Sequence, residues 1–478
     1  VSSVIANSDR AGKVTVIGGR YGLSSKDTDT AQIVAVFDNL AAAEPKRGFT
    51  IGITDDVTNL SLPVRPLDDF EDGDTYSCKF WGLGGDGTVG ANHNTIRILG
   101  DCADMYAQAY FEYDSKKSFG VTKSHLRLSK KPIRSTYYVK RADFVACHNQ
   151  SYVRQYDMVQ EVKPGGTFLL NTSWTPEGLD ANLPGKMKRY IAQNGIRLFT
   201  VDAVEVAQRV GLGSHINTVL QAAFFQIAGL MPVEEALDYM KDAARKSYAR
   251  KGDAVVAKNV AAIEEGAQKC VEVAVPASWA DAPLDENAAE ADVPAVVENI
   301  LRPVNAQKGD DLPVSAFAGY EDGVIDMGLT AYEKRGIAVK TPAWNAETCI
   351  QCNRCAFVCP HAAIRPYLLD QDEAQNAPEG FATVALKGGK NLPEGTRYAI
   401  QVSQFDCTSC GSCADVCPAG ALDMQPAKLT DQARKLWDFG LTISDKDGAF
   451  DPYTVKGSQF KQPLLEFSGA CAGCGETP

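Results

Sequence analysis

Eight cysteines occur in two copies of one spacing, and this spacing is typical of iron–sulfur ligation. In each copy the cysteines stand at positions one, four, seven and eleven, and a proline follows directly. The first copy is Cys349, Cys352, Cys355, Cys359 and Pro360, and the second is Cys407, Cys410, Cys413, Cys417 and Pro418. Three thiolates of one loop can bind three corners of a cubane, while the fourth points toward the neighbouring cluster. The spacing therefore predicts two [4Fe-4S] clusters with crossed ligation.

The crossed arrangement divides the cysteines into two ligand sets. We expect one cluster on Cys349, Cys352, Cys355 and Cys417, and the other on Cys407, Cys410, Cys413 and Cys359. Zinc also uses cysteines two residues apart, but it needs four ligands per site and gives no reason for the third cysteine of each loop. Disulfides fit less well, because clustered cysteines in a long chain suggest a reducing interior.

Length and composition limit the remaining possibilities. The 478 residues suffice for about three domains. Apolar residues make up 45% and charged residues 23%, which is ordinary for a soluble globular protein. The net charge of -12 argues against a nucleic-acid partner, because no basic surplus can replace phosphate counterions. With no apolar run of about 18 residues and no export signal at the start, no membrane span is expected and the cytoplasm is the default compartment.

Alternating strand and helix patterns precede the cysteine motifs. Residues 13–18, 29–40 and 49–54 predict a strand, a helix and a strand of an α/β domain. A second α/β region starts at residue 75, with a predicted helix at 91–99 and an apolar helix at 218–228. Its predicted strands are 78–81, 107–113, 136–139, 144–146, 166–170 and 197–201. Such alternation favours an open, mostly parallel sheet.

These patterns predict a multidomain α/β chain with Rossmann-like open-sheet domains and an α+β bacterial-type two-[4Fe-4S] ferredoxin domain. The segment 276–330, rich in Ala, Asp, Glu and Pro, reads as an extended linker. The predicted boundaries are 1–62 for the last part of one α/β domain, 63–275 for the second, 276–330 for the linker, 331–426 for the ferredoxin-like domain and 427–478 for a connector that leads into a further domain.

A glycine loop lies between the first strand and the first helix of the second α/β region. Gly82, Gly84 and Gly87 fit the first, third and sixth positions of a dinucleotide-binding fingerprint, and Glu112 and Asp114 follow where a ribose-binding carboxylate could lie. Glycines allow a phosphate to approach the backbone, and the helix start offers N–H donors. The loop lacks the Gly-Lys-Ser/Thr ending of nucleoside-triphosphate hydrolases. The pattern favours a phosphate-bearing ligand over an unliganded turn and does not name it.

The remaining cysteines form two groups. Cys471 and Cys474 lie near the end of the sequence in what reads as another ligand loop, but two thiolates cannot hold a cubane alone. Since the sequence also lacks an initiator Met, we expect either a piece of a longer polypeptide or a partner that supplies the other ligands. Isolated cysteines are expected to be small core residues: Cys78, Cys102, Cys147 and Cys270.

Several longer stretches carry a family resemblance. They are residues 17–26, 36–40, 55–58, 79–92, 124–127, 131–137, the two cysteine motifs and residues 467–478. Together, and in this order, they resemble pyruvate:ferredoxin oxidoreductase, the single-chain 2-oxoacid oxidoreductase of anaerobes. The resemblance implies that this chain is the middle of such an enzyme, which acts as a homodimer when intact.

The resemblance also implies cofactors and site residues. The 63–275 domain would handle coenzyme A, with contacts from Gly82, Gly84, Asp86, Gly87, Thr88 and Asn92, and with Ser124, His125 and Arg127 nearby. For His125, a buried histidine that bonds the backbone is the alternative. Cys471 and Cys474 would bind part of a third [4Fe-4S] cluster, and Glu476 would lie near thiamin diphosphate, which binds with Mg2+ in the further domain.

The implied reaction is the oxidative decarboxylation of pyruvate with coenzyme A to acetyl-CoA and carbon dioxide, with electrons passed through the clusters to ferredoxin or flavodoxin. This chain alone would be incomplete and inactive. An oxidoreductase for another 2-oxoacid is one alternative, although those enzymes are commonly split among subunits. A non-catalytic ferredoxin-like carrier is another, but it would need neither the glycine loop nor Cys471 and Cys474. A nicotinamide ligand for the glycine loop is the third.

Overall fold

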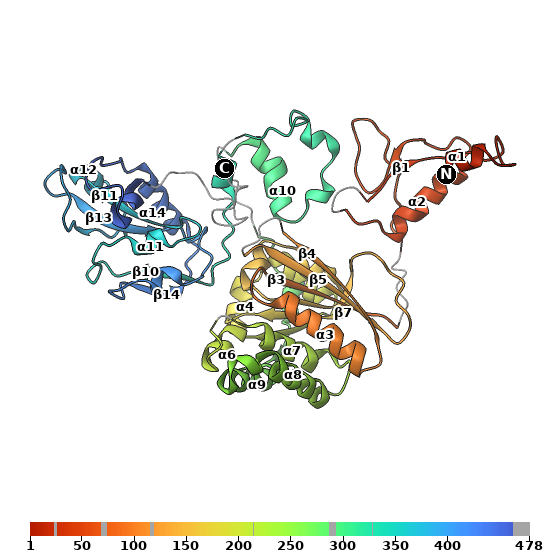
Figure 1. The fold of residues 1–478 in the computed structure, drawn as a ribbon, viewed down its shortest axis with the longest axis horizontal. Coiled ribbons are helices and arrows are strands. Elements are labelled where there is room, and N and C mark those ends of the chain that lie inside the picture. The colour runs from red at the N-terminus through yellow and green to blue at the C-terminus, as the bar shows by residue number, and fades with distance from the viewer. Residues whose placement is uncertain are drawn as a thin grey trace.

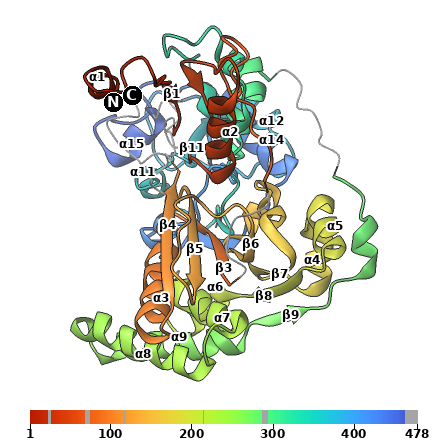
Figure 2. The same ribbon diagram turned by 90° about the vertical axis from the view of Figure 1, so that its right-hand side faces the viewer.

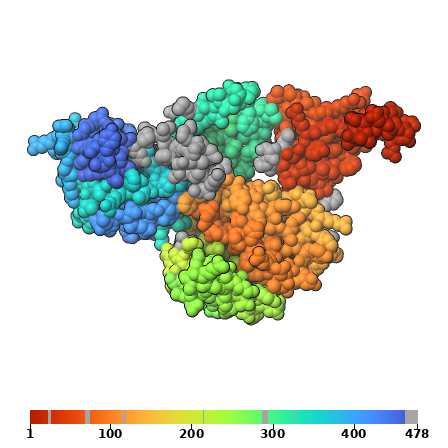
Figure 3. Space-filling view, viewed as in Figure 1, coloured from red at the N-terminus to blue at the C-terminus, as the bar shows by residue number. Residues whose placement is uncertain are grey.

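The computed structural model describes three structured units and the segment that connects them. The described residues are 1–22, 26–67, 74–114, 119–213, 215–285, 293–326 and 328–461. An N-terminal unit and a cluster-bearing unit lie toward opposite ends of the long axis, with an α/β unit between and below them (Figure 1). The segment that contains α10 lies above the α/β unit, between the two end units (Figures 1 and 3).

The N-terminal unit is a small strand, helix, strand arrangement. Its elements are α1 (Ser2–Ala6), β1 (Gly19–Arg20), α2 (Thr30–Ala41) and β2 (Phe49–Thr50). β1 and β2 pair in parallel, and the Asp29 side chain caps α2 by accepting a hydrogen bond from the Gln32 backbone N. The predicted helix is confirmed, whereas the first strand is short and lies at residues 19–20, after the predicted run.

The α/β unit contains a seven-stranded mixed sheet in the order β4-β5-β3-β6-β7-β8-β9. Its strands are β3 (Tyr76–Leu83), β4 (Tyr106–Tyr113), β5 (Val121–Ser129), β6 (Ala142–Cys147), β7 (Val162–Asn171), β8 (Arg197–Val201) and β9 (Val271–Val273). Only the pairs β3–β6, β6–β7 and β7–β8 are parallel. The prediction of a mostly parallel sheet is therefore wrong for the half that contains β4 and β5, because β5 returns directly beside β3 as an antiparallel strand.

Helices cover both faces of this sheet (Figures 1 and 2). The larger layer contains α3 (Thr88–Cys102), α6 (Ala203–Arg209), α7 (Asn217–Ala228), α8 (Val233–Tyr248) and α9 (Asp253–Gln268). The opposite layer contains α4 (Pro176–Asn182), α5 (Gly185–Gln193) and the short turns Gln150–Arg154 and Met158–Glu161. The predicted apolar helix is confirmed as α7, which is mostly buried and ends at Gly229 in the left-handed conformation (φ 62°).

The cluster-bearing unit repeats a strand, cysteine loop, helix, strand pattern. The repeats are β10 (Lys340–Trp344), α11 (Arg354–Phe357), β11 (Ile364–Leu369), and β13 (Arg397–Val402), α13 (Ser412–Asp415), β14 (Leu422–Pro426). β10 pairs with β14 and β11 with β13, both antiparallel, so each repeat contributes one strand to each pair. This pairing brings the two cysteine loops into one compact unit.

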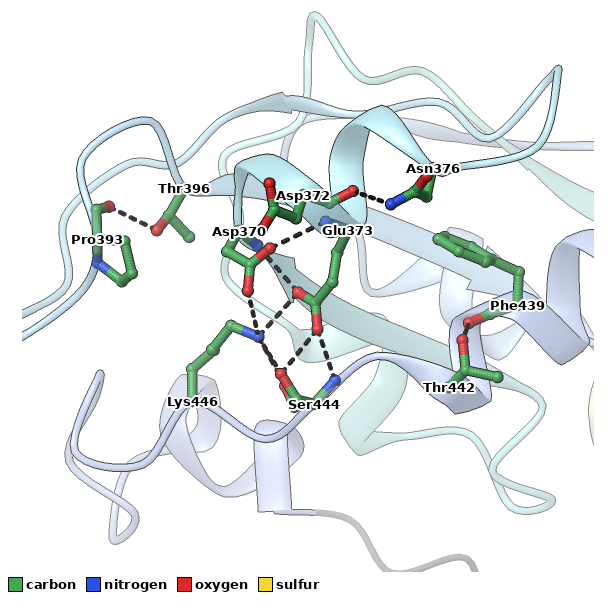
Figure 4. Close-up of polar contacts among 10 residues, drawn as sticks. All are labelled: Asp370, Asp372, Glu373, Asn376, Pro393, Thr396, Phe439, Thr442, Ser444 and Lys446. Carbon is green, nitrogen blue, oxygen red and sulfur yellow. Dashed lines mark hydrogen bonds and ion pairs between the residues drawn. The ribbon is translucent and has the colours of Figure 1, made fainter.

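Additional elements surround these two repeats. They are α12 (Gln371–Gln375), β12 (Val384–Ala385), α14 (Asp431–Thr442), α15 (Val455–Ser458) and the turn Gln459–Lys461. α12 begins with a capping box between Asp370 and Glu373. Glu373 also accepts hydrogen bonds from Ser444 and Lys446, which hold the inserted segment against the chain after α14 (Figure 4).

The connecting segment after β9 is made of short helical turns. They are Ala277–Asp281, Val297–Leu301, α10 (Arg302–Asn305), Gly309–Asp311, Val314–Phe317 and Leu329–Tyr332. Trp279 and Val297 are buried, so parts of the segment pack against the folded units. None of the described helices is long and apolar enough to cross a membrane.

Candidate functional site

The eight motif cysteines surround two separate cavities. Cys349, Cys352, Cys355 and Cys417 line the first, which we call site I, together with Trp344, Tyr398 and Ile400. Cys407, Cys410, Cys413 and Cys359 line the second, site II, together with Pro342, His361 and Met424. In each site three thiols come from one loop and the fourth from the end of the other motif. This is the division that the crossed arrangement predicts.

The backbone of both loops is shaped in the same way. Gln351 and Asn353 in the first loop, and Ser409 and Gly411 in the second, have positive φ values of 60°, 59°, 64° and 80°. These left-handed residues turn the chain so that successive cysteines face one cavity. The repetition at equivalent positions shows that the two loops are built alike.

Backbone N–H groups point at ligand sulfurs in both sites. Gln351 N donates to Cys349 Sγ at 3.4 Å, and Ala421 N donates to Cys417 Sγ at 3.2 Å. The equivalent donors of site II are Ser409 N to Cys407 Sγ at 3.4 Å and Ala363 N to Cys359 Sγ at 3.3 Å. Such donors stabilise negative charge on cysteine sulfurs and are among the features that set cluster potentials.

The surroundings of site I are fixed by buried polar contacts. Tyr398 Oη donates to Asn353 Oδ1 at 2.7 Å, and Asn353 Nδ2 donates to the backbone O of Lys456 at 2.8 Å. Gln351 Nε2 donates to the O of Ala385 at 2.8 Å. These contacts hold both left-handed residues of the first loop in place.

Four of the eight thiols are buried deeply enough to disfavour their charged form. Burial raises the pKa of Cys355 and of Cys407 to about 12 and that of Cys413 to about 11. Burial also raises the pKa of Cys359. Thiols of this kind stay protonated until a metal displaces the proton. Four thiols around a cavity, two of them with N–H donors on their sulfurs, fit an iron–sulfur cluster in each site.

The glycine loop forms a tight turn between β3 and α3. Asp86 lies at its centre and accepts hydrogen bonds from Leu83 N at 2.8 Å and Thr88 N at 2.7 Å. Gly87 at the start of α3 has φ 86°, and a Cβ atom there would lie 2.7 Å from Asn217 Cγ. The Asp86 carboxylate thus takes two of the backbone donors that the fingerprint offers to a phosphate.

The end of the loop contacts a histidine that the sequence patterns did not identify. Thr88 Oγ1 lies 2.6 Å from Nδ1 of His148, which follows directly after β6. Burial lowers the pKa of His148 to about 4, so its ring is neutral near pH 7. Because the carboxyl ends of parallel strands meet at one sheet edge, the position of His148 just after a predicted strand was the available signal.

Buried polar groups lie beneath the start of α3. Asn92 Nδ2, Thr122 Oγ1 and Ser124 Oγ are buried without a hydrogen-bond partner among the described residues. Thr122 and Ser124 alternate onto one face of β5, the face that α3 covers. Asn92 therefore lies within α3 and Ser124 beneath it, and of these three residues only Thr122 lies directly opposite Gly82 of the loop.

His125 and Arg127 lie on the other face of β5. His125 Nε2 is 2.6 Å from Glu112 Oε2, and its Nδ1 accepts a hydrogen bond from Val139 N at 3.2 Å. Arg127 is 1% exposed and donates to the backbone O of Tyr137 at 2.5 Å. The structure thus places both side chains away from the α3 face, and the buried, backbone-bonded arrangement of His125 is the alternative stated for it above.

This face of the sheet contains further buried charges. Lys79 Nζ pairs with Glu161 Oε1 at 2.5 Å, and Trp81 Nε1 donates to Glu161 Oε2 at 2.9 Å. Lys123 Nζ pairs with Glu112 Oε2 at 3.2 Å. The Glu112 carboxylate is therefore bonded to His125 and Lys123 on the face opposite α3. Its strand, β4, nevertheless ends at the same sheet edge as the glycine loop.

The other cysteines divide by position. Cys78 and Cys147 are buried in the sheet, as expected of core residues, Cys270 is half-buried, and Cys102 is exposed at the end of α3. The prediction of a core position is wrong for Cys102, because it lies on the exposed side of the end of α3, whereas Leu99 in the same turn is buried. The predicted sites at Cys471, Cys474 and Glu476 lie outside the described residues.

Three parts of the chain match known families. Residues 77–269 match the family described as pyruvate ferredoxin/flavodoxin oxidoreductase, and residues 348–422 match a 4Fe-4S dicluster domain. Residues 284–338 match a domain of unknown function. An α/β unit that matches this family, joined to a dicluster unit, defines an iron–sulfur protein of mixed α/β and ferredoxin-like fold.

Relatives that match over the whole length of this chain agree with this class. The chain is 52% identical to a pyruvate:ferredoxin oxidoreductase of Moorella thermoacetica and 50% identical to a pyruvate-flavodoxin oxidoreductase of Enterobacter agglomerans, each over 100% of this chain. It covers 41% and 40% of these relatives, so it spans about two fifths of their length. A mitochondrial pyruvate dehydrogenase [NADP(+)] of Euglena gracilis is 44% identical over 97% of the chain, which covers 26% of that protein. The resemblance is confirmed to this extent: residues 77–269 match the pyruvate ferredoxin/flavodoxin oxidoreductase family, and the whole chain is similar to one part of these longer enzymes.

Proposed function

We propose that this chain is the electron-conducting and coenzyme A-handling part of a pyruvate oxidoreductase that forms acetyl-CoA and carbon dioxide. The observation that carries the proposal is the division of eight cysteines into two four-thiol cavities with N–H donors on the sulfurs. Identity of 52% to a pyruvate:ferredoxin oxidoreductase supports pyruvate as the 2-oxoacid. The domain boundaries predicted above remain part of the proposal.

The residues of the cluster-bearing unit have separate tasks in this function. Eight thiolates would hold one [4Fe-4S] cluster in site I and one in site II. When bound, such a cluster takes up and releases single electrons. The backbone donors at Gln351, Ala363, Ser409 and Ala421 stabilise the added negative charge on the sulfurs. Tyr398 and Ile400 close site I with apolar surface, which limits the access of water.

The proposed electron acceptor is a ferredoxin or a flavodoxin. The names of the Moorella and Enterobacter relatives support this choice. The Euglena relative is named for NADP(+), and this chain covers only 26% of it. The shared segment is therefore compatible with different terminal acceptors, and regions outside it decide between them.

Other regions of the intact enzyme complete the proposal. Cys471 and Cys474 would bind part of a third cluster, and Glu476 would lie near thiamin diphosphate and its Mg2+. These assignments rest on the family resemblance, as does the homodimer. Without the regions that would bind thiamin diphosphate, the chain alone is expected not to turn over pyruvate.

Coenzyme A is the proposed ligand of the α/β unit, at the sheet edge formed by the glycine loop and His148. This assignment rests on the family resemblance of the α/β unit, of which residues 77–269 match the family model. Because Asp86 already occupies two loop donors, a phosphate here would need the remaining donors. Isothermal titration of the chain with coenzyme A and with NADH separates the two ligand classes. Binding of coenzyme A is expected, and tight NADH binding without coenzyme A binding would contradict the assignment.

Replacing one crossed ligand tests the cluster proposal. The anaerobically reconstituted chain should contain about eight iron atoms in the two complete motifs. In Cys417→Ser, alkylation read by mass spectrometry should modify Cys349, Cys352 and Cys355 and spare the thiols of site II. Cys359→Ser is the matched control and should expose site II in place of site I. Zinc in the sites, or exposure of site II in Cys417→Ser, would refute the proposal.

A further inference from the structure

Residues 333–337, which we call the bridge segment, lie between the α/β unit and the cluster-bearing unit and bond to both. Toward the cluster-bearing unit, Lys334 Nζ pairs with Asp406 Oδ2 at 2.7 Å. Gly336 N donates to the backbone O of Phe405 at 2.8 Å. Both contacts are made to the residues directly before the second cysteine motif.

The same five residues also bond to the α/β unit. Arg335 Nη1 donates to the O of Phe119 at 2.9 Å, and the Gln155 side chain donates to the O of Arg335. Asn149 Nδ2 donates to the O of Ile337 at 3.3 Å. Asn149 follows β6 and Phe119 precedes β5, so these contacts lie at the sheet edge that contains the glycine loop.

The bridge segment reaches site II. Asp406 directly precedes Cys407 in the chain, and Cys407 is a predicted ligand of that site. His361, which also lines site II, packs edge-on against Phe119 with ring centroids 6.3 Å apart. Phe119 is therefore contacted by the bridge segment on its backbone and by site II on its ring.

Site I has different residues at the equivalent positions. Thr348 precedes Cys349 where Asp406 precedes Cys407, and Ala419 follows Pro418 where His361 follows Pro360. A threonine and an alanine provide neither the charge nor the ring that the bridge segment and Phe119 use. The two sites are alike in their loops and unlike in these attachments.

The charges of Asp406 and Lys334 should affect the reduction potential of a cluster in site II. Asp406 brings a negative charge next to Cys407, and it also accepts a hydrogen bond from Ser403 Oγ at 2.5 Å. Lys334 compensates this charge from a position where the side chains are only 25% and 18% exposed. At such burial a charge is screened less than on the surface. A positive charge near a cluster favours its reduced form.

We propose that the bridge segment positions site II on the α/β unit and raises the reduction potential of its cluster selectively through Lys334. This assigns a role to part of the region that matches a domain of unknown function. The inference rests on the proposed iron–sulfur function. Lys334 is a positioning residue here, since it acts through Asp406.

The test is a double-mutant cycle on the Lys334–Asp406 ion pair in the reconstituted full chain. The variants are Lys334→Gln, Asp406→Asn and the double variant, each made with Cys417→Ser, which leaves only site II loaded, and with Cys359→Ser, which leaves only site I. Potentiometric titration followed by electron paramagnetic resonance then reads each site separately. Iron content and alkylation confirm which site is loaded.

A second ion pair of the same unit provides the matched control. Lys446 pairs with Glu373 at 2.8 Å and with Asp370 at 3.5 Å, and its side chain is 10% exposed (Figure 4). Lys446 lines neither site, so Lys446→Gln should lower stability without moving either potential. The Lys446→Gln variant therefore distinguishes the effect of losing any buried ion pair of this unit from the effect of losing the positive charge at site II.

The expected result is specific in site and in sign. Lys334→Gln should lower the potential of site II by up to about 59 mV, which is tenfold in a one-electron equilibrium. Asp406→Asn should raise it, and the double variant should return near the original value. Equal shifts in both sites, or no shift in loaded site II, would overturn the inference.

A second measurement, which does not require bound iron, tests the bridge in variants that fail to load iron. In small-angle scattering, Lys334→Gln should enlarge the radius of gyration of the unloaded chain, because the two units separate, while Lys446→Gln should not. Unchanged scattering by Lys334→Gln would also count against the bridge. An unaltered chain that binds no iron at all would contradict the proposed function itself.

Discussion

The neighbours of each cysteine decide its chemistry in this chain. The motif thiols face cavities, and four of their sulfurs receive backbone N–H donors. Burial raises the pKa of several of these thiols, including Cys355 and Cys407, which suits ligands that lose their proton to a metal. Cys78 and Cys147 have similarly raised pKa values because they are fully buried, but they lie in the hydrophobic layers of the sheet. Spacing in the sequence distinguished these groups correctly, because three thiols within seven residues can face one cavity only when the loop turns sharply.

The buried pair of His125 and Glu112 predicts a pH dependence of stability. Burial lowers the pKa of His125 from 6.5 to about 4, although the Glu112 hydrogen bond opposes the effect. Between these values the unfolded chain binds more protons than the folded one, so the free energy of unfolding falls as pH falls. Glu112 adds a second loss below pH 4.5: burial raises its pKa, but the His125 hydrogen bond and the Lys123 charge lower it to about 2 overall.

His125→Gln isolates the contribution of the histidine. The fall in stability between pH 6.5 and 5 should become smaller than in the unaltered chain, by on the order of 1–2 kcal/mol. Denaturant unfolding at several pH values under anaerobic conditions measures it. His215→Gln is the control, because His215 is exposed. An identical pH profile for the unaltered chain and His125→Gln would disprove the predicted role.

At the scale of elements, strand β5 shows where the sequence was insufficient. Val121–Ser129 carries Lys123, His125 and Arg127 on one face, and such a polar face does not read as a buried strand. In the structure these polar side chains are buried or nearly so, because Glu112, Gln108 and backbone carbonyls bond to them. Partners on the neighbouring strand β4 and in the loop after β5 therefore decide the burial of β5, and a reading of this segment alone does not include them. By contrast α7, whose burial depends only on apolar side chains, was predicted almost to the residue.

The start of α3 depends on Gly87. Its φ of 86° is strained for other residues, and an added Cβ would meet the Asn217 side chain at 2.7 Å. Gly87→Ala should therefore reduce the free energy of unfolding by about 1–3 kcal/mol. Gly90→Ala is the matched control: it lies in the same helix with open space around its Cβ position and should stabilise by about 0.5–1 kcal/mol. Chemical denaturation measures both, and equal effects would contradict the assigned turn.

At the scale of the whole molecule, the segment after β9 connects all three units. Lys26 Nζ donates to the O of Asp310 at 2.5 Å, and Ser315 N donates to Asp56 Oδ1 at 2.9 Å, which ties the N-terminal unit to this segment. The bridge segment then continues to the cluster-bearing unit. Composition suggested an extended linker here, because acidic and small residues offer little to bury. Its contacts are mostly polar and span long sequence separations, and a composition count does not register such contacts.

Asp157 anchors this connecting segment to the α/β unit. It accepts from Lys308 at 2.5 Å and from Lys186 at 3.1 Å; burial raises its pKa, but these two partners lower it overall. Asp157→Asn weakens both pairs, which in this half-exposed position contribute about 1 kcal/mol. Local opening near Lys308 should then become roughly fivefold more frequent. When opening and closing of the segment are fast relative to cleavage, the cleavage rate follows the population of the open form. Trypsin should then cleave after Lys308 about fivefold faster in Asp157→Asn than in the unaltered chain.

Limited proteolysis with mass spectrometry of the fragments tests the anchoring. Glu272→Gln is the control, because it breaks the exposed pair with Arg197 at the sheet edge, which does not touch the connecting segment. Cleavage after Lys308 should be unchanged in this control. An increase of equal size in both variants would show that general destabilisation, and not release of the segment, exposes the site. Unchanged cleavage in Asp157→Asn would show that the remaining contacts, such as that between Ser315 and Asp56, suffice to hold the segment in place.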